Sequence, residues 1–218
     1  MEIFKKESNL FNEWSKNRDD FVTDGVVSEK DYITSELKLC FILKEVNDEG
    51  GGGWDLRKFI RQGSCGNTWN NITRWVMCID KIDTDIPWSS LESIDEAQRM
   101  ELLLPICAMN LKKSPGGSST IQSELEDAVE EDQSFIRQQY SLYKPNFTIC
   151  CGTGWDFRYA LGLNDGEIFK TSKGIEWFRN HDLNPVVVYN HPQARIKGTT
   201  LTYDLANAIR EILAEVKS

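Results

Sequence analysis

Polar residues suited to acid–base chemistry and hydrogen bonding follow several apolar runs of strand length in this 218-residue chain. The most informative group is Asn190-His191-Pro192-Gln193-Ala194-Arg195, directly after the run Pro185–Tyr189. The chain has only two histidines, and a neutral imidazole such as that of His191 can donate one N–H to developing negative charge. Pro192 restricts the backbone that carries it. The alternative is a structural histidine that caps the strand end or binds a backbone carbonyl.

The residues after another strand-like run, Lys38–Leu43, could activate or hold a water molecule. They are charged or amide side chains: Lys44, Glu45, Asn47 and Asp48. A carboxylate can accept a proton from water, and Lys44 could either pair with Glu45 or face a phosphate. A third run, at 104–110, ends in Asn110, whose side-chain amide offers one donor and one acceptor in fixed geometry. Asn110 could instead bind the backbone of the following turn.

Four glycines at 50–53 precede Trp54, and such a run permits backbone conformations that other residues exclude. Two interpretations stay open: a mobile loop that lays Trp54 over a flat ligand ring, or a surface loop that Trp54 anchors to the core. Basic and hydroxyl side chains near the strand ends are candidate contacts for phosphate groups. They are Lys112, Lys113, Ser114, Ser118, Arg195 and Lys197.

The elements that would position these residues alternate between helix and strand. Helical periodicity predicts helices at 2–20, 29–36, 67–80, 95–102, 121–143, 155–162 and 202–216. Apolar runs predict buried strands at 38–43, 104–110, 147–151 and 185–190, and a hairpin at 167–178. This alternation favours an α/β fold: a three-layer α/β/α architecture with a central four-stranded, mostly parallel sheet. The carboxyl ends of parallel strands meet at one edge, so the polar groups would converge there.

The length and composition fit one domain over 1–218, with residues 1–36 as a helical extension packed on it. The chain has no apolar stretch long enough for a membrane span and no hydrophobic signal core, which predicts a cytoplasmic protein without a membrane partner. Its six cysteines contain no C-x-x-C spacing, so we expect neither a disulfide framework nor a metal site. We also expect a monomer.

The net charge of −9 argues against a uniformly basic nucleic-acid-binding surface. Six acidic residues fall between Glu124 and Asp132, where they are expected to form the solvated face of a helix; mimicry of DNA charge is the alternative. Basic residues without neighbouring acids follow two of the strands. Positive charge is therefore expected to gather at the strand ends.

The order and spacing of these motifs resemble those of the uracil-DNA glycosylase superfamily over roughly residues 37–216. That family has a first motif with a water-positioning polar residue, an Asn on the second strand and a terminal His-Pro motif. The resemblance implies an enzyme that extrudes a nucleotide from DNA and hydrolyses the bond between base and sugar, without a metal or organic cofactor. It further implies that His191 donates to a base oxygen and that Glu45 holds the water, with Asn47 and Asp48 as rivals. The implied base contacts are Asn110, Asn190 and Trp54.

The first motif departs from the family pattern. Family members commonly have Gly first and Pro fourth in this turn, whereas this chain has Lys44 and Asn47, and Val46 stands where some members have Asp. These departures favour a specialised branch that acts on a bulky modified pyrimidine such as those in phage DNA. Two other functions stay open: a non-catalytic nucleic-acid-binding module with the same fold, and an interaction protein that uses the acidic helix at 121–143 against a basic partner.

Overall fold

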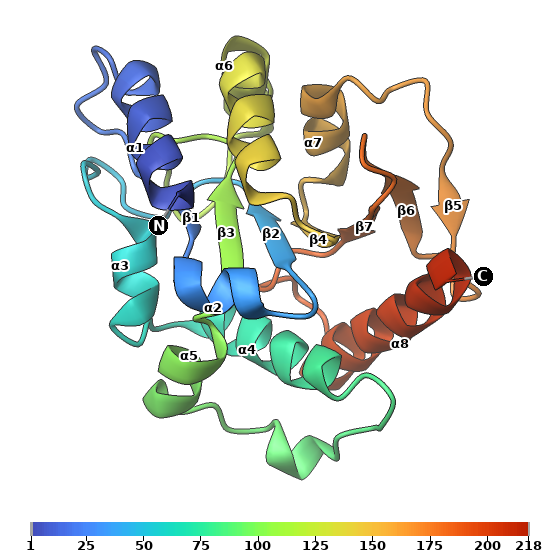
Figure 1. Ribbon diagram of the computed structural model, residues 1–218. Helices are drawn as coiled ribbons and strands as arrows, with labels where there is room; N and C mark the ends of the chain where they lie inside the picture. The colour runs from blue at the N-terminus through green and yellow to red at the C-terminus, as the bar shows by residue number, and fades with distance from the viewer. Residues whose placement is uncertain (1, 218) are drawn as a thin grey trace.

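The computed structural model describes residues 2–217 and contains a mixed sheet of seven strands (Figure 1). The strands lie in the order β1-β3-β2-β4-β7-β6-β5. Their bounds are Gly25–Val26 (β1), Leu39–Leu43 (β2), Ile106–Asn110 (β3), Phe147–Cys151 (β4), Phe169–Lys170 (β5), Glu176–Arg179 (β6) and Pro185–Tyr189 (β7). The four inner strands β3, β2, β4 and β7 pair in parallel, whereas β1, β6 and β5 join them antiparallel.

The α/β class predicted from the sequence is confirmed, but the predicted sheet of four strands is not: the four predicted strands form the inner part of a sheet of seven. The predicted hairpin at 167–178 is present as β5 and β6 and extends the sheet beside β7. The other additional strand, β1, has only two residues, and so short a strand carries no periodic signal. It pairs with β3 through Gly25, where an added Cβ would lie 2.2 Å from the Tyr143 hydroxyl, so the close approach requires glycine.

Helices cover both faces of the sheet. Their bounds within the described chain are Ile3–Trp14 (α1), Glu29–Thr34 (α2), Leu56–Arg61 (α3), Asn67–Asp80 (α4), Glu96–Leu102 (α5), Gln122–Tyr143 (α6), Gly154–Leu161 (α7) and Gly198–Lys217 (α8). Helices α1, α6 and α7 pack on one face, and α3, α4 and α8 pack on the other (Figure 1).

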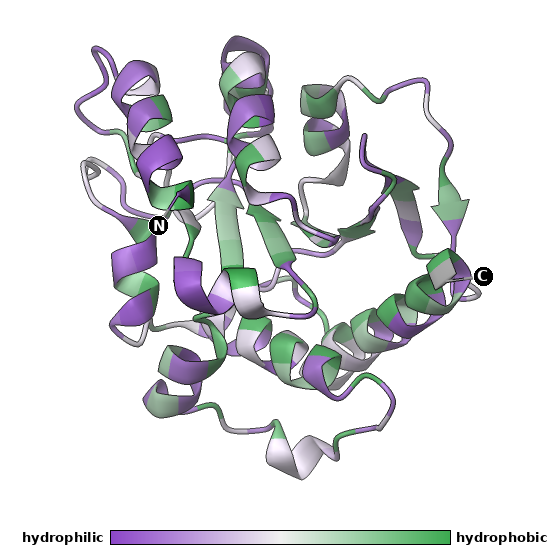
Figure 2. Ribbon diagram, viewed as in Figure 1, coloured by the Kyte–Doolittle hydropathy of each residue, from purple (hydrophilic) through white to green (hydrophobic). Residues whose placement is uncertain are grey.

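Alternate residues of each buried strand divide between these two cores. In β2, Phe41 stacks with Trp75 of α4, whereas Ile42 lies in the same core as Leu125 of α6. Figure 2 shows the hydrophobic colour along β2 and β3 that this burial on both faces requires. The sheet is therefore a rigid base for the loops at its edges.

The N-terminal segment is more than the helical extension expected for residues 1–36. Helices α1 and α2 form, but β1 lies between them and belongs to the sheet. Helix α1 packs on α6, where the ring centroids of Trp14 and Phe135 stack at 5.3 Å. The segment between β2 and α4, where the sequence predicts no helix, contains α3. Among residues 2–217, none of the helices combines the length and apolar character needed to cross a membrane.

Candidate active site at the carboxyl edge of the sheet

The loops that follow the four parallel strands lie together at the carboxyl edge of the sheet. The segments after β2 and β3 run side by side, because the Lys112 N–H donates to the Lys44 carbonyl at 2.9 Å. The segments after β4 and β7 are joined in the same way, with the Gly152 N–H donating to the Tyr189 carbonyl at 2.8 Å. The convergence of the sequence-predicted residues at one edge follows directly from the parallel pairing.

His191 is half-buried just beyond β7, and its Nδ1 is already engaged. The Gln193 N–H donates to Nδ1 at 3.1 Å, so Nδ1 is the acceptor and a neutral ring carries its proton on Nε2. Burial, and then the nearby positive charge of Lys44, lower the pKa of His191 below its ordinary value. His191 is therefore a neutral donor through Nε2 at neutral pH. Its bond to Gln193 is local and structural, which leaves the second nitrogen for a ligand.

Helix α4 holds the His-Pro turn from outside its own strand. The Asn71 side-chain amide donates to the Pro192 carbonyl at 2.6 Å, and the Gln193 amide donates to the Thr68 hydroxyl at 2.8 Å. Sequence reasoning did not identify these positioning contacts. The available signal was the concentration of amide and hydroxyl residues at the start of α4, the face that meets the turn carrying His191.

Glu45, two residues after β2, has a buried carboxylate oxygen that accepts no hydrogen bond within the described residues. The side chain is 4% exposed, and this oxygen is Oε2. The Lys112 ammonium lies 3.9 Å from Oε2, at the long limit for an ion pair. Gly116 leaves room for the carboxylate, because an added Cβ there would lie 2.6 Å from Oε1. A buried carboxylate oxygen without a donor is costly, which favours a group kept for a ligand.

Asn110, the last residue of β3, is 2% exposed and is held through its backbone. Its N–H donates to Asp24 Oδ2 at 2.7 Å, and its carbonyl accepts from Lys113 Nζ at 2.8 Å. The side-chain amide has no hydrogen-bond partner within residues 2–217. The following turn thus does not use the amide, and Asn110 combines a fixed backbone with an available recognition group.

The glycine loop is tied down by Asp48. Its Oδ2 accepts the Gly52 N–H at 3.0 Å and the Trp54 indole N–H at 2.8 Å. The Trp54 ring packs on the core and lies edge-on to Phe59, with centroids 5.9 Å apart. Trp54 therefore anchors the loop, as the second interpretation of the sequence expected, and the Asp48 carboxylate is occupied by that loop. Asn47 is exposed beside it.

The candidate phosphate contacts do not form one basic surface. Lys112 pairs at 3.1 Å with Glu124, from the first turn of the acidic helix α6. The expectation of positive charge without neighbouring acids is therefore wrong at this position, because α6 begins beside the strand ends. The remaining candidates and Asn190 differ in exposure: Asn190, Ser118, Arg195 and Lys197 are exposed, and Ser114 is half-buried.

The prediction that Lys113 contacts phosphate is wrong, because its side chain is buried. Its ammonium lies 2.7 and 2.8 Å from the two carboxylate oxygens of Asp24, and it also donates to the Asn110 carbonyl. Gln139 donates to Asp24 at 2.7 Å. The ion pair is internal: it holds the backbone at the end of β3 in place and is not available to a surface ligand.

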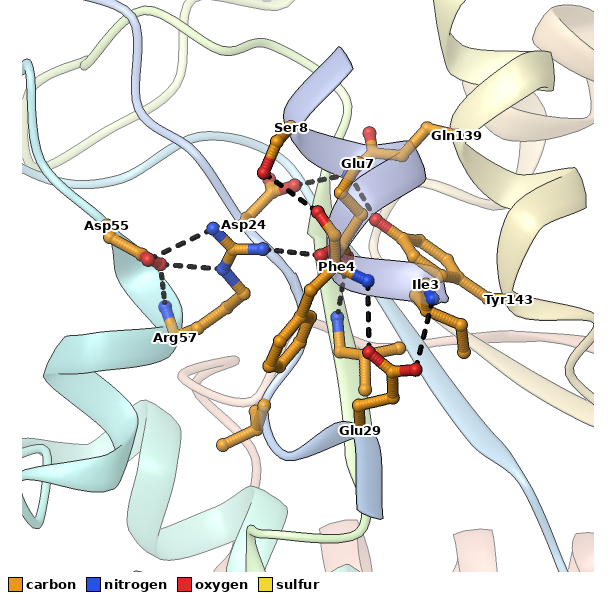
Figure 3. A network of polar contacts seen from close by, with 12 residues as sticks. Ile3, Phe4, Glu7, Ser8, Asp24, Glu29, Asp55, Arg57, Gln139 and Tyr143 are labelled. Carbon is orange, nitrogen blue, oxygen red and sulfur yellow. Dashed lines mark hydrogen bonds and ion pairs between the residues drawn. The ribbon is translucent and has the colours of Figure 1, made fainter. Parts of the chain in front are cut away.

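A second buried pair continues this network under helix α1 (Figure 3). Arg57 donates to Glu7 at 2.5 Å and to its own helix cap, Asp55, at 2.8 Å. The Glu7 side chain is fully buried, and this burial raises its pKa to about 7 despite the opposing charge of Arg57. We call the five residues Glu7, Asp24, Arg57, Lys113 and Gln139 the buried network.

We call the four residues Lys44, Glu45, Asn110 and His191 the strand-end site. Across residues 2–217, no group of three or more His, Cys, Asp or Glu side chains could hold a metal ion, and all six cysteines are free. No protein-family model matches this chain, and no curated protein matches it.

Proposed function

We propose that the strand-end site belongs to a DNA glycosylase, which hydrolyses the N-glycosidic bond of an extruded uracil-like or modified pyrimidine. The observation that carries this proposal is the occupied Nδ1 of His191, which leaves the one proton of a neutral ring on Nε2. A flipped pyrimidine presents a carbonyl oxygen that becomes more negative as the base leaves. A neutral donor, held by a turn and a neighbouring helix, is suited to that oxygen.

In the proposed reaction the C1′–N bond breaks and its electron pair leaves with the base, while the oxygen of a water molecule bonds to C1′. His191 Nε2–H donates a hydrogen bond to the base oxygen where charge develops. The Glu45 carboxylate stabilises the cationic sugar and accepts the proton that the water releases. The unpaired Oε2 of Glu45 supports this role. Asp48 is the weaker rival because its carboxylate already accepts two N–H groups, and Asn47 remains a candidate for holding the water.

Asn110 would read the base edge, since its amide has no protein partner while its backbone is fixed. The narrower proposal, a modified pyrimidine such as those of phage DNA, rests on Lys44. This residue stands where the resembled family commonly has glycine, and its charge lies close enough to His191 to lower the pKa of that ring. A cation there favours a base that carries additional acceptor groups. The partner is then DNA, and the monomeric, cytoplasmic state stays a prediction.

The test is base release from labelled single-stranded and duplex DNA that contains uracil, a mismatched base or a phage-type modified pyrimidine. We expect release from at least one substrate, and we expect Glu45→Gln to slow the single-turnover step by about 10²–10⁴-fold while DNA binding is retained. Glu124→Gln is the matched control, because it removes a carboxylate at the rim that lies opposite Lys112 rather than in the site. Tight binding with intact DNA across the panel would instead favour the non-catalytic module.

A further inference from the structure

A small cavity of about 110 Å³ is lined by residues of α7, the segment 162–168, β5 and β6. Strands β6 and β5 lie beyond β7 at the end of the sheet (Figure 1). The cavity walls include Arg158 and Arg179 together with the apolar side of Phe178. In the sheet register, Arg179 of β6 lies opposite Pro185, the first residue of β7, whereas His191 comes after the last residue of β7. Because β7 alone spans about 13 Å, the cavity and His191 lie at opposite ends of the strand.

Arg158 is the unusual group in this cavity, because its charge is buried without an acidic partner. The residue is 8% exposed, and its guanidinium lies 5.8 Å from the ring centroids of Trp155 and Phe178. It donates to the Gly166 carbonyl, but its Nε has neither solvent access nor a hydrogen-bond partner within the described chain. No carboxylate oxygen of residues 2–217 lies within ion-pair distance of it. A buried guanidinium in this condition is costly unless an anion or water satisfies it.

Arg179 adds a second guanidinium without an acidic partner among the described residues. It donates to the Leu183 carbonyl at 3.3 Å and lies 5.4 Å from the ring centroid of Trp177. The chain has a net charge of −9. Two arginines without acidic partners on one cavity therefore stand out against its overall excess of acidic residues. The cavity volume of about 110 Å³ equals about three to four water molecules, which is enough for a small tetrahedral oxyanion.

We propose that this cavity binds an oxyanion of the phosphate class, with Arg158 as its principal ligand and Arg179 as a second positive charge. The planar guanidinium fork matches phosphate geometry, and the charge of Arg158 has no carboxylate partner within the described chain. Glu167 also lines the cavity and forms no ion pair with Arg158. Its negative charge opposes the bound anion, so affinity is held below what the two arginines alone would give.

The experiment measures binding of inorganic phosphate and sulfate by calorimetry and thermal shift, with chloride at equal ionic strength as the reference. We expect stabilisation by both oxyanions, and we expect Arg158→Gln to weaken phosphate binding by roughly tenfold or more, as for the loss of a charged hydrogen bond. Arg137→Gln is the control, since Arg137 also donates to α7, at the Ala160 carbonyl, but does not line the cavity. The proposal would be overturned if phosphate or sulfate bound the full chain no more tightly than chloride does.

Glu167→Gln provides a test that does not depend on removing a buried arginine. If the cavity holds an oxyanion, this variant binds phosphate more tightly than the unaltered protein, because a like charge has been removed. If Glu167 is instead the partner of Arg158 in solution, the variant loses stability and gains no affinity, which contradicts the proposal.

Two further ligands identify the source of the phosphate group. Binding of thymidine 5′-monophosphate but not of a dinucleotide phosphodiester points to a small phosphomonoester, and binding of both points to a nucleic-acid strand; either result supports an oxyanion site. The proposal is independent of the glycosylase proposal. Arg158→Gln is expected to leave base release unchanged, so failure of one account is distinguishable from failure of the other.

Discussion

Asn110 belongs to two polar regions that differ in whether their buried polar groups have partners. In the buried network below β3, each charged group faces a charged partner: Lys113 contacts both oxygens of Asp24, and Arg57 contacts Glu7. In the strand-end site, the Asn110 amide and an oxygen of Glu45 have no hydrogen-bond partner within the described residues. The backbone of Asn110 belongs to the first region and its side chain to the second.

This difference separates groups that hold the site in place from groups that are available to a ligand. Paired buried charges hold the strand end in one geometry but offer nothing to a ligand. Unpaired buried groups lower stability and are retained where a ligand will satisfy them. We therefore expect changes in the buried network to affect mainly stability, and changes in the strand-end site to affect mainly chemistry.

The largest stability effect is expected from breaking the Asp24–Lys113 pair. Lys113→Met leaves the Asp24 carboxylate buried without its countercharge, and such a loss typically costs about 3–5 kcal/mol in the free energy of unfolding. The double variant Asp24→Leu/Lys113→Met removes both charges and is expected to recover part of that loss. Urea denaturation of the single and double variants measures both values. A single-variant cost below about 1 kcal/mol would contradict a structural role for the pair.

Glu7 makes the stability of the buried network depend on pH. Its folded pKa of about 7 lies above its usual value of 4.5, so between these values the native protein binds more protons than the unfolded chain. The free energy of unfolding should therefore fall as the pH rises from about 4.5 to about 7, by an amount of the order of 3 kcal/mol. Comparison with Glu7→Gln across this range isolates the effect. Parallel stability curves for the two proteins would rule it out.

Glu45→Gln should separate stability from activity in the strand-end site. The variant removes a buried, unpaired carboxylate oxygen, so we expect the free energy of unfolding to stay the same or to rise by up to about 1 kcal/mol. Base release should fall in the same protein. Thermal denaturation beside a single-turnover assay checks both directions. A large loss of stability with unchanged base release would place Glu45 among the structural residues.

The smallest effect is expected at the glycine loop. Trp54→Phe retains an aromatic ring but removes the hydrogen bond from the indole N–H to Asp48, at a cost of about 1 kcal/mol. Because Trp54 anchors the loop to the core, we expect base release to change little. Amide hydrogen exchange at 50–53 measures the loosening of the loop. A strong rise in KM for Trp54→Phe, with no change in exchange, would restore the base-stacking interpretation.

The sequence predicted the α/β class and the edge at which the candidate residues meet. Short apolar runs that end in polar residues are a local signal, and parallel pairing then brings Asn110 and His191 to the same edge. The roles of these residues in base excision stay predictions. The tautomer of His191 was not predictable, because it depends on the conformation of the turn that places the Gln193 N–H against Nδ1.

Lys112 and Lys113 demonstrate why the rest could not be predicted. These neighbours in sequence have opposite surroundings, since Lys112 pairs with Glu124 near the surface and Lys113 is buried against Asp24. Asp24 and Lys113 are 89 residues apart, and no local pattern links them. The same reason hides β1, whose two residues join the sheet only because β3 provides an unpaired edge.

The most direct test of the central claim is the single-turnover rate of base release in His191→Ala, measured on the substrate that the unaltered protein cleaves. The other histidine gives the control, His181→Ala, because His181 contacts the Leu161 carbonyl on α7 and lies outside the strand-end site. We predict that His191→Ala slows release by about 10²–10³-fold with little change in the free energy of unfolding, while His181→Ala retains the rate. Equal rates in the two variants would contradict the assignment of the strand-end site as the place of base excision.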